Sequence, residues 1–420
     1  MEALEDLRVI IPVGGEAKRL KPLTAETSKA VVRLFNRPIV EFALATLATQ
    51  GIKNFIFGVK GYVNYKSLFD YFKEGIGFSV RYGISPRVHL RYQPPVDDVG
   101  SADSVRINMD YFGIEGPVMV VQGDNLFELD VTNFLQFHHA RQSLMTVALT
   151  EVSEVERYGV AELQPNGRIL RFVEKPKPEV APSNLASAGM YLLAPQIREV
   201  FADPAVQAMI RESKRLDFGM DFIPFLVSHG YDVYGYTLRG EWYDVGTPEQ
   251  YLRTMLKGLR LADRIPFKLG EPTPGLGAVW IQGAGAEAKR RKDEIVRKVQ
   301  NGKIALEGSV FIGRHCQIGD GVIIRDSCID NFCIIGPRAT IERSAVMDRV
   351  IVDEGAEIRD SIIARHARIR SSRERPTYVT DVSVIGDDVE IHEGSVIVGS
   401  KVFPHKVISA GTKIVNATVQ

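Results

Sequence analysis

The chain of 420 residues has few cysteines, no excess of charge of either sign and no long apolar run. It has three cysteines and two tryptophans, and its 52 basic side chains are balanced by 52 acidic ones, so the formal net charge is zero. It contains no run of 18 apolar residues, the length that a membrane-spanning helix needs. These absences argue against a disulfide scaffold, a membrane-spanning protein, and a protein whose main partner is nucleic acid or a membrane surface.

The cysteines also argue against a structural metal site. Cys316, Cys328 and Cys333 fall within one short stretch, with no CxxC spacing and no accompanying histidine ligands. The N-terminal sequence MEALEDLRVIIPV is acidic and has no basic segment followed by a long apolar one, so no signal peptide is expected. We therefore expect a cytoplasmic protein.

The first half of the chain alternates between strand and helix patterns. Short apolar runs at 9–13, 55–59, 118–121 and 143–150 are separated by helical periodicity at 37–50 and 62–72. This alternation predicts βαβ units and an α/β domain with a Rossmann-like, mostly parallel sheet. Glycines follow the first and third of these runs, at Gly14-Gly15 and Gly123. Ligands bind at the carboxyl ends of strands in such sheets, so both turns are candidate ligand sites.

The second half follows a different repeat. From about Leu306, aliphatic residues recur at every sixth position, as in 306, 312, 318 and 324, then 329, 335 and 341, and later 385, 391 and 397. This hexapeptide pattern predicts a left-handed parallel β-helix, interrupted by a projecting loop at 370–380. We therefore predict three parts: an α/β domain (1–258), a linker and helix (259–303) and the β-helix (304–420).

One segment near the N-terminus combines glycines with basic residues. It reads GGEAKRLKPLT from Gly14 to Thr24, and Lys29 follows a little further on. Glycines at a strand end let backbone N–H groups approach a base or phosphate, and Arg19 and Lys29 can neutralise a polyphosphate. The segment is neither a Walker A motif nor GxGxxG, so by itself it is a weak signal.

This segment resembles the signature loop GGxGTRLxPLT of the sugar-1-phosphate nucleotidylyltransferases, also called NDP-sugar pyrophosphorylases. Further segments resemble that family's motifs in the same order: Tyr92-Gln93-Pro94-Pro95, Gly100-Ser101-Ala102-Asp103, residues 121–125 (VQGDN), residues 157–160 (RYGV), residues 172–176 (FVEKP), Ala188-Gly189-Met190-Tyr191, and residues 242–248 (WYDVGTP). A C-terminal hexapeptide helix also occurs in many members. The resemblance therefore covers nearly the whole chain.

The resemblance implies a reaction and a set of site residues. The reaction is Mg²⁺-dependent transfer of a nucleotidyl group from a nucleoside triphosphate to a hexose 1-phosphate, giving an NDP-sugar and pyrophosphate. Glucose 1-phosphate is the favoured acceptor and mannose 1-phosphate the next. The implied residues are Arg19, Lys29 and Lys175 for catalysis; Gly14, Gly15, Gln93, Gly100 and Asp124 for the nucleotide; Gly159, Glu174 and Lys175 for the sugar phosphate; and Asp124 and Asp244 for Mg²⁺. No protein nucleophile is required, because positioning and charge neutralisation suffice for in-line attack.

Three positions depart from the family pattern. Ala17 replaces a glycine, Lys18 replaces a threonine, and Arg33 stands where the family usually has a proline. If the glycine requires a positive φ, alanine costs about 1 kcal/mol there. A non-catalytic, regulatory relative that binds nucleotide or NDP-sugar is therefore the alternative to an active enzyme.

Several properties stay open at this level. A β-helix scaffold with a degenerate first domain is disfavoured, because both metal-type aspartates are present. Some hexapeptide helices are acetyltransferases, but no catalytic histidine with an acyl-carrier pocket stands out. The base and the sugar are undecided. Because exposed coil faces of such helices commonly pack together, we expect a homo-oligomer formed through the β-helix.

Overall fold

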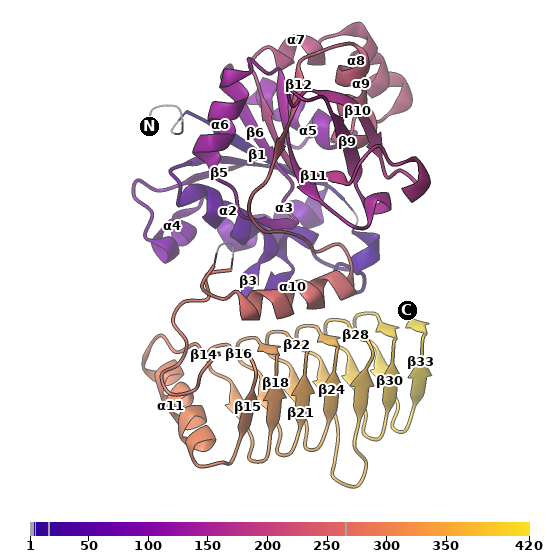
Figure 1. Ribbon diagram of the computed structural model, residues 1–420. Helices are drawn as coiled ribbons and strands as arrows, with labels where there is room; N and C mark the ends of the chain where they lie inside the picture. Colours follow the sequence, from indigo (N-terminus) through magenta and orange to yellow (C-terminus); the bar gives the residue numbers. More distant parts are fainter. Residues whose placement is uncertain (1–3, 5, 16, 265–266) are drawn as a thin grey trace. The chain divides into compact units, whose positions relative to one another are not determined.

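The computed structural model describes residues 4, 6–15, 17–264 and 267–420 (Figure 1). The chain divides into two compact units. The first unit comprises Met1–Gly15 and Val40–Tyr243, and the second comprises Glu16–Ile39 and Asp244–Gln420. This division differs from the predicted domains, because residues 16–39, which carry most of the signature segment, belong with the C-terminal unit. Within the described ranges, no helix combines the length and apolar character that crossing a membrane requires.

The first unit is built on a mixed sheet. Its strands follow the order β10 (Ile169–Glu174), β9 (Gly159–Leu163), β11 (Leu185–Leu193), β6 (Val118–Val121), β1 (Arg8–Val13), β4 (Asn54–Val59) and β5 (His89–Tyr92). The four strands from β6 to β5 are parallel, whereas β11 is antiparallel to both of its neighbours in this order and to β8 (Met145–Glu151). The strand β12 (Val233–Thr237) pairs in parallel with β8. The predicted α/β, Rossmann-like class is confirmed, and its parallel part carries the predicted glycine turns.

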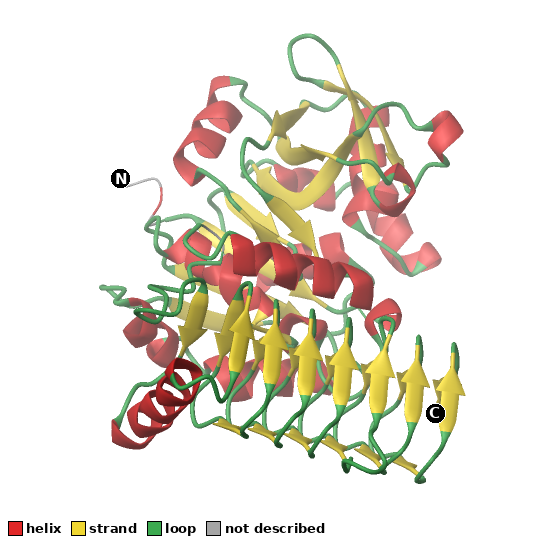
Figure 2. Ribbon diagram, turned by 60° about the horizontal axis from the view of Figure 1, so that its bottom comes forward, coloured by secondary structure: helices red, strands yellow, loops and turns green. Residues whose placement is uncertain are grey.

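Helices flank this sheet in Figures 1 and 2. They are α2 (Ile39–Ala48), α3 (Tyr62–Phe72), α4 (Ile76–Tyr82), α5 (Ser101–Tyr111), α6 (Val131–Ala140), α7 (Ile197–Phe201), α8 (Pro204–Ala208) and α9 (Ile223–Ser228). Val9, Ile10 and Ile11 on the central strand β1 are fully buried. Such continuous apolar runs are typical of strands covered on both faces. The predicted helices at 37–50 and 62–72 correspond to α2 and α3.

The second unit contains the predicted β-helix, whose strands lie side by side in Figure 2. One sheet consists of β14 (Val279–Ile281), β16 (Val310–Ile312), β19 (Cys328–Ile329), β22 (Ala345–Val346), β25 (Ile362–Ile363), β28 (Val384–Ile385), β31 (Lys401–Val402) and β34 (Thr418–Val419). A second consists of β15 (Ala305–Glu307), β18 (Ile323–Arg325), β21 (Thr340–Glu342), β24 (Glu357–Arg359), β27 (Tyr378–Thr380), β30 (Val396–Val398) and β33 (Lys413–Val415). The third consists of β17 (Gln317–Ile318), β20 (Ile334–Ile335), β23 (Ile351–Val352), β26 (Arg368–Ile369), β29 (Glu390–Ile391) and β32 (Val407–Ile408).

The hexapeptide prediction is confirmed by the register of these strands. Ile324 pairs with Ile341, and Ile341 pairs with Ile358, so equivalent residues of successive coils are 17 positions apart. These aliphatic residues are fully buried and form a single core cluster. The β-helix begins earlier than predicted, because β14 lies in the segment expected to be a linker. The predicted loop at 370–380 widens one coil, and its last residues form β27.

Two helices of the second unit accompany the β-helix. The helix α10 (Pro248–Arg260) begins after the N-cap Thr247, whose side chain accepts a hydrogen bond from the Gln250 N–H. The helix α11 (Ala286–Gln300) places Ile295 in the core cluster of the β-helix. The three cysteines are free and buried, as expected for a chain without a disulfide framework.

Asp330 is a carboxyl buried in the β-helix, with only 3% of its surface exposed. Its pKa is raised from 3.8 to about 7, chiefly by burial and secondly by the charge of the neighbouring Asp348. Arg33, the Asn36 N–H and the Cys328 thiol act in the opposite direction. Asp330 is therefore harder to ionise in the folded chain than in the unfolded chain.

This shift predicts a pH-dependent stability. Between pH 4 and 7 the folded chain holds a proton on Asp330 that the unfolded chain has lost, so the free energy of unfolding should fall as the pH rises. An effect on the order of a few kcal/mol is expected over this range. Denaturant unfolding of the wild type and of Asp330→Asn at pH 5 and pH 8 measures it. The asparagine variant should show a smaller difference between the two pH values, and an unchanged difference would contradict the assignment.

Candidate functional site

The signature segment of the second unit contains a left-handed turn at Ala17. Its φ is 44° and its ψ is 41°. The Ala17 carbonyl accepts hydrogen bonds from the Leu20 N–H and from the Thr24 hydroxyl, both at 3.0 Å. The family's glycine therefore falls at a position with positive φ, as considered above, and alanine is strained there by about 1 kcal/mol. The two hydrogen bonds help to hold this strained backbone.

Two of the predicted cations gather near Asp244 in the second unit. The Lys29 ammonium nitrogen lies 3.7 Å from Asp244 Oδ1, and Gln250 Nε2 donates to Asp244 Oδ2 at 3.2 Å. A Cβ atom placed on Gly246 would lie 3.0 Å from Asp244 Oδ2 and 3.2 Å from Arg19 Nη2. The structure thus brings Arg19, Lys29 and Asp244 together, although Asp244 is more than 200 residues away from the other two in sequence.

Gly246 and Gln250 were not among the predicted site residues. Gly246 leaves room for the Arg19 and Asp244 side chains, and its N–H donates to Gln250 Oε1 at 3.2 Å. Both residues follow Asp244 closely in the sequence WYDVGTPEQ. Thr247 followed by Pro248 is a typical signal for the start of a helix, and it could have drawn attention to these neighbouring residues.

In the first unit, four predicted site residues lie at the carboxyl ends of three parallel strands. Gly14 and Gly15 follow β1, Gln93 follows β5, and Asp124 lies just after β6. Gly123 is required for a close approach, since a Cβ atom there would lie 2.9 Å from Ile11 on β1. The GD turn therefore crosses directly over the neighbouring strand, and this places the half-buried Asp124 at the ligand-binding edge of the sheet.

Gln93 is held by hydrogen bonds to its neighbours, and Gly100 packs closely against the backbone of Leu216. The Gln93 amide donates to the Val96 carbonyl at 2.9 Å and accepts from Ser104 Oγ at 2.7 Å and Asn108 Nδ2 at 2.8 Å. A base contact by Gln93 would have to replace one of these bonds. A Cβ atom on Gly100, whose φ is 154°, would lie 2.5 Å from the Leu216 carbonyl oxygen. The glycine is thus needed for packing before α5, and its nucleotide role stays a prediction.

Glu174 occupies a cradle formed by two glycines. A Cβ atom on Gly159 would lie 2.6 Å from Glu174 Oε2, and one on Gly219 would overlap the same oxygen. The Lys175 ammonium lies 3.3 Å from Glu174 Oε1. Burial raises the pKa of Glu174, Lys175 opposes this effect, and the charge of Asp217 adds to it. Three predicted sugar-phosphate residues, Gly159, Glu174 and Lys175, are therefore brought together.

Sequence reasoning missed the residues around this cradle. Asp217 accepts hydrogen bonds from the Gly219 N–H at 3.0 Å and from Ser101 Oγ at 2.7 Å. Tyr191 is buried, and its pKa is raised first by burial and further by the charges of Asp217, Glu174 and Asp124. These carboxylates thus surround one buried phenol. Asp217 and Gly219 both lie in the segment DFGMDF, which starts at Asp217.

Filling the cradle should impair binding of the sugar phosphate. In Gly159→Ala the new methyl group would overlap Glu174 and Phe172, and such overpacking costs about 1–3 kcal/mol. We expect the KM for the sugar phosphate to rise about tenfold or more, with a smaller change in the KM for the nucleotide. Steady-state pyrophosphate release measures both constants. Gly116→Ala is a suitable control, because a Cβ atom there meets open space; a rise in both constants alike would count against a sugar-phosphate role.

The residues predicted to bind Mg²⁺ are Asp124, which lies in the first unit, and Asp244, which lies in the second. Carboxylate oxygens are the hard ligands that Mg²⁺ prefers, and Mg²⁺ commonly uses one or two of them together with water and substrate phosphates. These two residues fit that chemistry. Over the ranges that the structure describes, no three His, Cys, Asp or Glu side chains are grouped in a way that could hold a metal ion by themselves. Substrate oxygens would therefore have to complete the coordination.

Comparison with protein-family models gives two matches. The family described as "Nucleotidyl transferase" matches residues 8–260, and "GMPPB C-terminal domain" matches residues 301–418. Together they cover the signature segment, the sheet, α10 and most of the β-helix.

Curated relatives match almost from end to end. A glucose-1-phosphate adenylyltransferase of Desulfitobacterium hafniense (strain Y51) is 27% identical over 91% of this chain and 94% of its own. A UTP–glucose-1-phosphate uridylyltransferase of Synechocystis is 26% identical over 88% and 97%. A mannose-1-phosphate guanyltransferase of Schizosaccharomyces pombe is 25% identical over 97% and 98%.

A solved structure shares the fold of the larger part of the chain. It is a Bacillus anthracis protein assigned as a glucose-1-phosphate thymidylyltransferase, with a TM-score of 0.51 and 23% identity. The match covers 62% of this chain and 99% of that one. At this identity the similarity concerns the fold alone.

Proposed function

Because this chain belongs to the nucleotidyl transferase family, we propose that it transfers a nucleotidyl group from a nucleoside triphosphate to a hexose 1-phosphate. The observation that supports this most is the convergence of Arg19, Lys29 and Asp244 in the second unit. Glucose 1-phosphate is the proposed acceptor and mannose 1-phosphate the next candidate. Both sugars occur in the names of end-to-end relatives.

The proposed chemistry is an in-line displacement at the α-phosphorus. A phosphate oxygen of the sugar phosphate forms a bond to that phosphorus, the bond to the bridging oxygen of the β-phosphate breaks, and pyrophosphate leaves with the electron pair. Arg19 and Lys29 would neutralise the α-phosphate and the leaving group. Lys175 would bind the phosphate of the sugar phosphate, and Glu174 would accept hydrogen bonds from sugar hydroxyls. When bound by Asp124 and Asp244, Mg²⁺ would neutralise further phosphate charge.

A substrate screen tests this proposal. The purified chain is incubated with Mg²⁺, each nucleoside triphosphate and each of glucose and mannose 1-phosphate, and pyrophosphate release is measured. The expected result is turnover with one preferred pair, and its loss when EDTA removes the metal. Nucleotide binding without any turnover would overturn the enzyme proposal and favour the regulatory alternative that Ala17 and Lys18 left open.

We also propose that the chain forms a homo-oligomer through its β-helix. The outward-facing side chains of Ile323, Phe332 and Ile334 are 37–43% exposed on that domain. Pairing of such faces would bury them. A monomeric mass by light scattering at micromolar concentration would refute this proposal.

A further inference from the structure

A strained hairpin links the signature segment to the β-helix within the second unit. Its strands are β2 (Arg33–Leu34) and β3 (Arg37–Pro38), and its two turn residues, Phe35 and Asn36, have φ values of 51° and 63°. A bulky residue such as phenylalanine is an outlier at positive φ, and such strain persists only where the surroundings hold it. We call residues 33–38 the signature hairpin.

Aromatic packing holds the first turn residue. Phe35 is 1% exposed and contacts Phe267 and Phe311 edge-on, with ring centroids 6.0 Å and 5.8 Å away. Phe311 belongs to β16 of the β-helix. The apolar contact therefore anchors the tip of the signature hairpin to the first coils.

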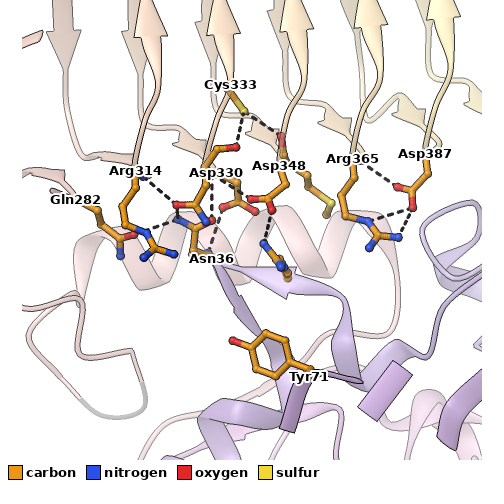
Figure 3. Close-up of polar contacts among 12 residues, drawn as sticks. Asn36, Tyr71, Gln282, Arg314, Asp330, Cys333, Asp348, Arg365 and Asp387 are labelled. Carbon is orange, nitrogen blue, oxygen red and sulfur yellow. Dashed lines mark hydrogen bonds and ion pairs between the residues drawn. The ribbon is translucent and has the colours of Figure 1, made fainter. Parts of the chain in front are cut away.

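Hydrogen bonds hold the second turn residue, as Figure 3 shows. The Asn36 amide nitrogen donates to Gln282 Oε1 at 3.1 Å and to Asn331 Oδ1 at 2.8 Å. The Asn36 N–H donates to Asp330 Oδ1 at 3.1 Å, and its side-chain oxygen accepts from the Asn331 N–H at 3.2 Å. Four bonds from three residues of the second unit thus converge on one asparagine.

An ion pair and a further hydrogen bond hold the base of the signature hairpin. The Arg33 guanidinium lies 2.6 Å from Asp348 Oδ2, with the two side chains 25% and 15% exposed. The Tyr251 hydroxyl of α10 donates to the Arg33 carbonyl at 2.6 Å. A proline, which the family usually has at this position, could not form the ion pair.

Besides binding Arg33, Asp348 also links two successive coils of the β-helix. Its Oδ1 accepts from the N–H of Asn331 in the preceding coil at 3.1 Å. Asp387 does the same for Arg365, whose N–H it accepts at 3.0 Å, and it pairs with the guanidinium of that same residue. Both aspartates are visible in Figure 3. The two carboxylates differ in that Asp348 also binds the signature hairpin.

The signature hairpin directly continues the segment that carries Lys29. Lys29 begins a single 3₁₀ turn, Lys29–Val31, and the Val32 N–H donates to the Lys29 carbonyl at 3.1 Å. Only Val32 separates this turn from Arg33, where β2 begins. A displacement of the hairpin would therefore be passed on to Lys29, and small misplacements of reacting groups can cost orders of magnitude in rate.

We infer that Arg33 and Asn36 are positioning residues, through which Asp348, Asp330 and Asn331 of the β-helix hold Lys29 in place for nucleotidyl transfer. This inference rests on the proposed function. It makes the β-helix part of the catalytic apparatus of this chain.

Paired substitutions test the inference. Asp348→Asn removes the charge that holds Arg33 and keeps the side-chain shape, whereas Asp387→Asn removes an equivalent coil charge that does not bind the hairpin. We expect Asp348→Asn to lower kcat about tenfold, with the KM for the nucleotide changed less than threefold, and Asp387→Asn to leave kcat within twofold. Asp348→Glu, which keeps the charge, should recover part of the loss.

A second measurement does not depend on turnover. Backbone amide exchange in residues 28–38 should become faster in Asp348→Asn and stay unchanged in Asp387→Asn. Equal kcat values in the wild type and Asp348→Asn, or equal losses in both aspartate variants, would overturn the inference. If the wild type releases no pyrophosphate, the proposed function fails, and the inference is then decided by exchange alone: unchanged exchange in Asp348→Asn overturns it.

Discussion

Replacing Asp244 by asparagine is expected to lower kcat by about 10²–10³-fold, the range seen when one group that stabilises transition-state charge is removed. The carboxylate lies 3.7 Å from the Lys29 ammonium nitrogen and belongs to the convergence that includes Arg19. It is also a proposed Mg²⁺ ligand. Asparagine has the same shape and keeps an oxygen that can accept the bond from Gln250, so the local fold should persist.

The metal dependence of this variant provides a second readout. If Asp244 binds Mg²⁺, the concentration of Mg²⁺ that gives half-maximal activity should rise in Asp244→Asn along with the loss of kcat. Asp293→Asn, an exposed position on α11, is the control and should behave like the wild type. Full activity of Asp244→Asn at the Mg²⁺ optimum of the wild type would contradict both roles.

Truncating one core residue of the β-helix is expected to have the largest effect on stability. Ile341 is fully buried and stacks between Ile324 and Ile358 in the coils on either side. Parallel coils leave little freedom for these neighbours to close a cavity, so Ile341→Ala should lower the free energy of unfolding by about 2–5 kcal/mol. Urea unfolding followed by circular dichroism measures the change.

Val407→Ala is the control for this prediction. Val407 lies on β32 of the same β-helix, outside the face proposed to pair in the homo-oligomer, and its side chain is 66% exposed. Truncating this exposed side chain should lower the free energy of unfolding much less than Ile341→Ala does. The reason is that the change removes far less buried surface and opens no internal cavity. Similar losses in the two variants would show that burial does not govern stability in this domain.

Local patterns were sufficient for much of the fold. The six-residue spacing from Leu306 onward predicted the β-helix, because each coil must present an aliphatic residue to the same interior at the same point of its turn. The apolar runs ending at Gly14-Gly15 and Gly123 likewise predicted the strands β1 and β6, which end just before these glycines. At Ala17, the family's glycine was a sound guide to a backbone position with positive φ.

The site was predicted less completely, for a physical reason. The residue types were recognised from short motifs, and the structure places Gly159, Glu174 and Lys175 close together. The cradle also needs Gly219, however, and the charge environment of Glu174 depends on Asp217. These partners are more than 40 residues away, and no local periodicity reports a contact between them.

The composition and periodicity of the chain therefore determined its fold class and its two kinds of architecture, since these follow from interactions between near neighbours in sequence. Tertiary structure alone decided that residues 16–39 join the C-terminal unit, that Asp244 faces Lys29, and that Arg33 pairs with Asp348. Such contacts join residues hundreds of positions apart, and their formation depends on how whole elements pack. The formal net charge of zero therefore says nothing about the ion pairs and carboxylate clusters that form only when the chain folds.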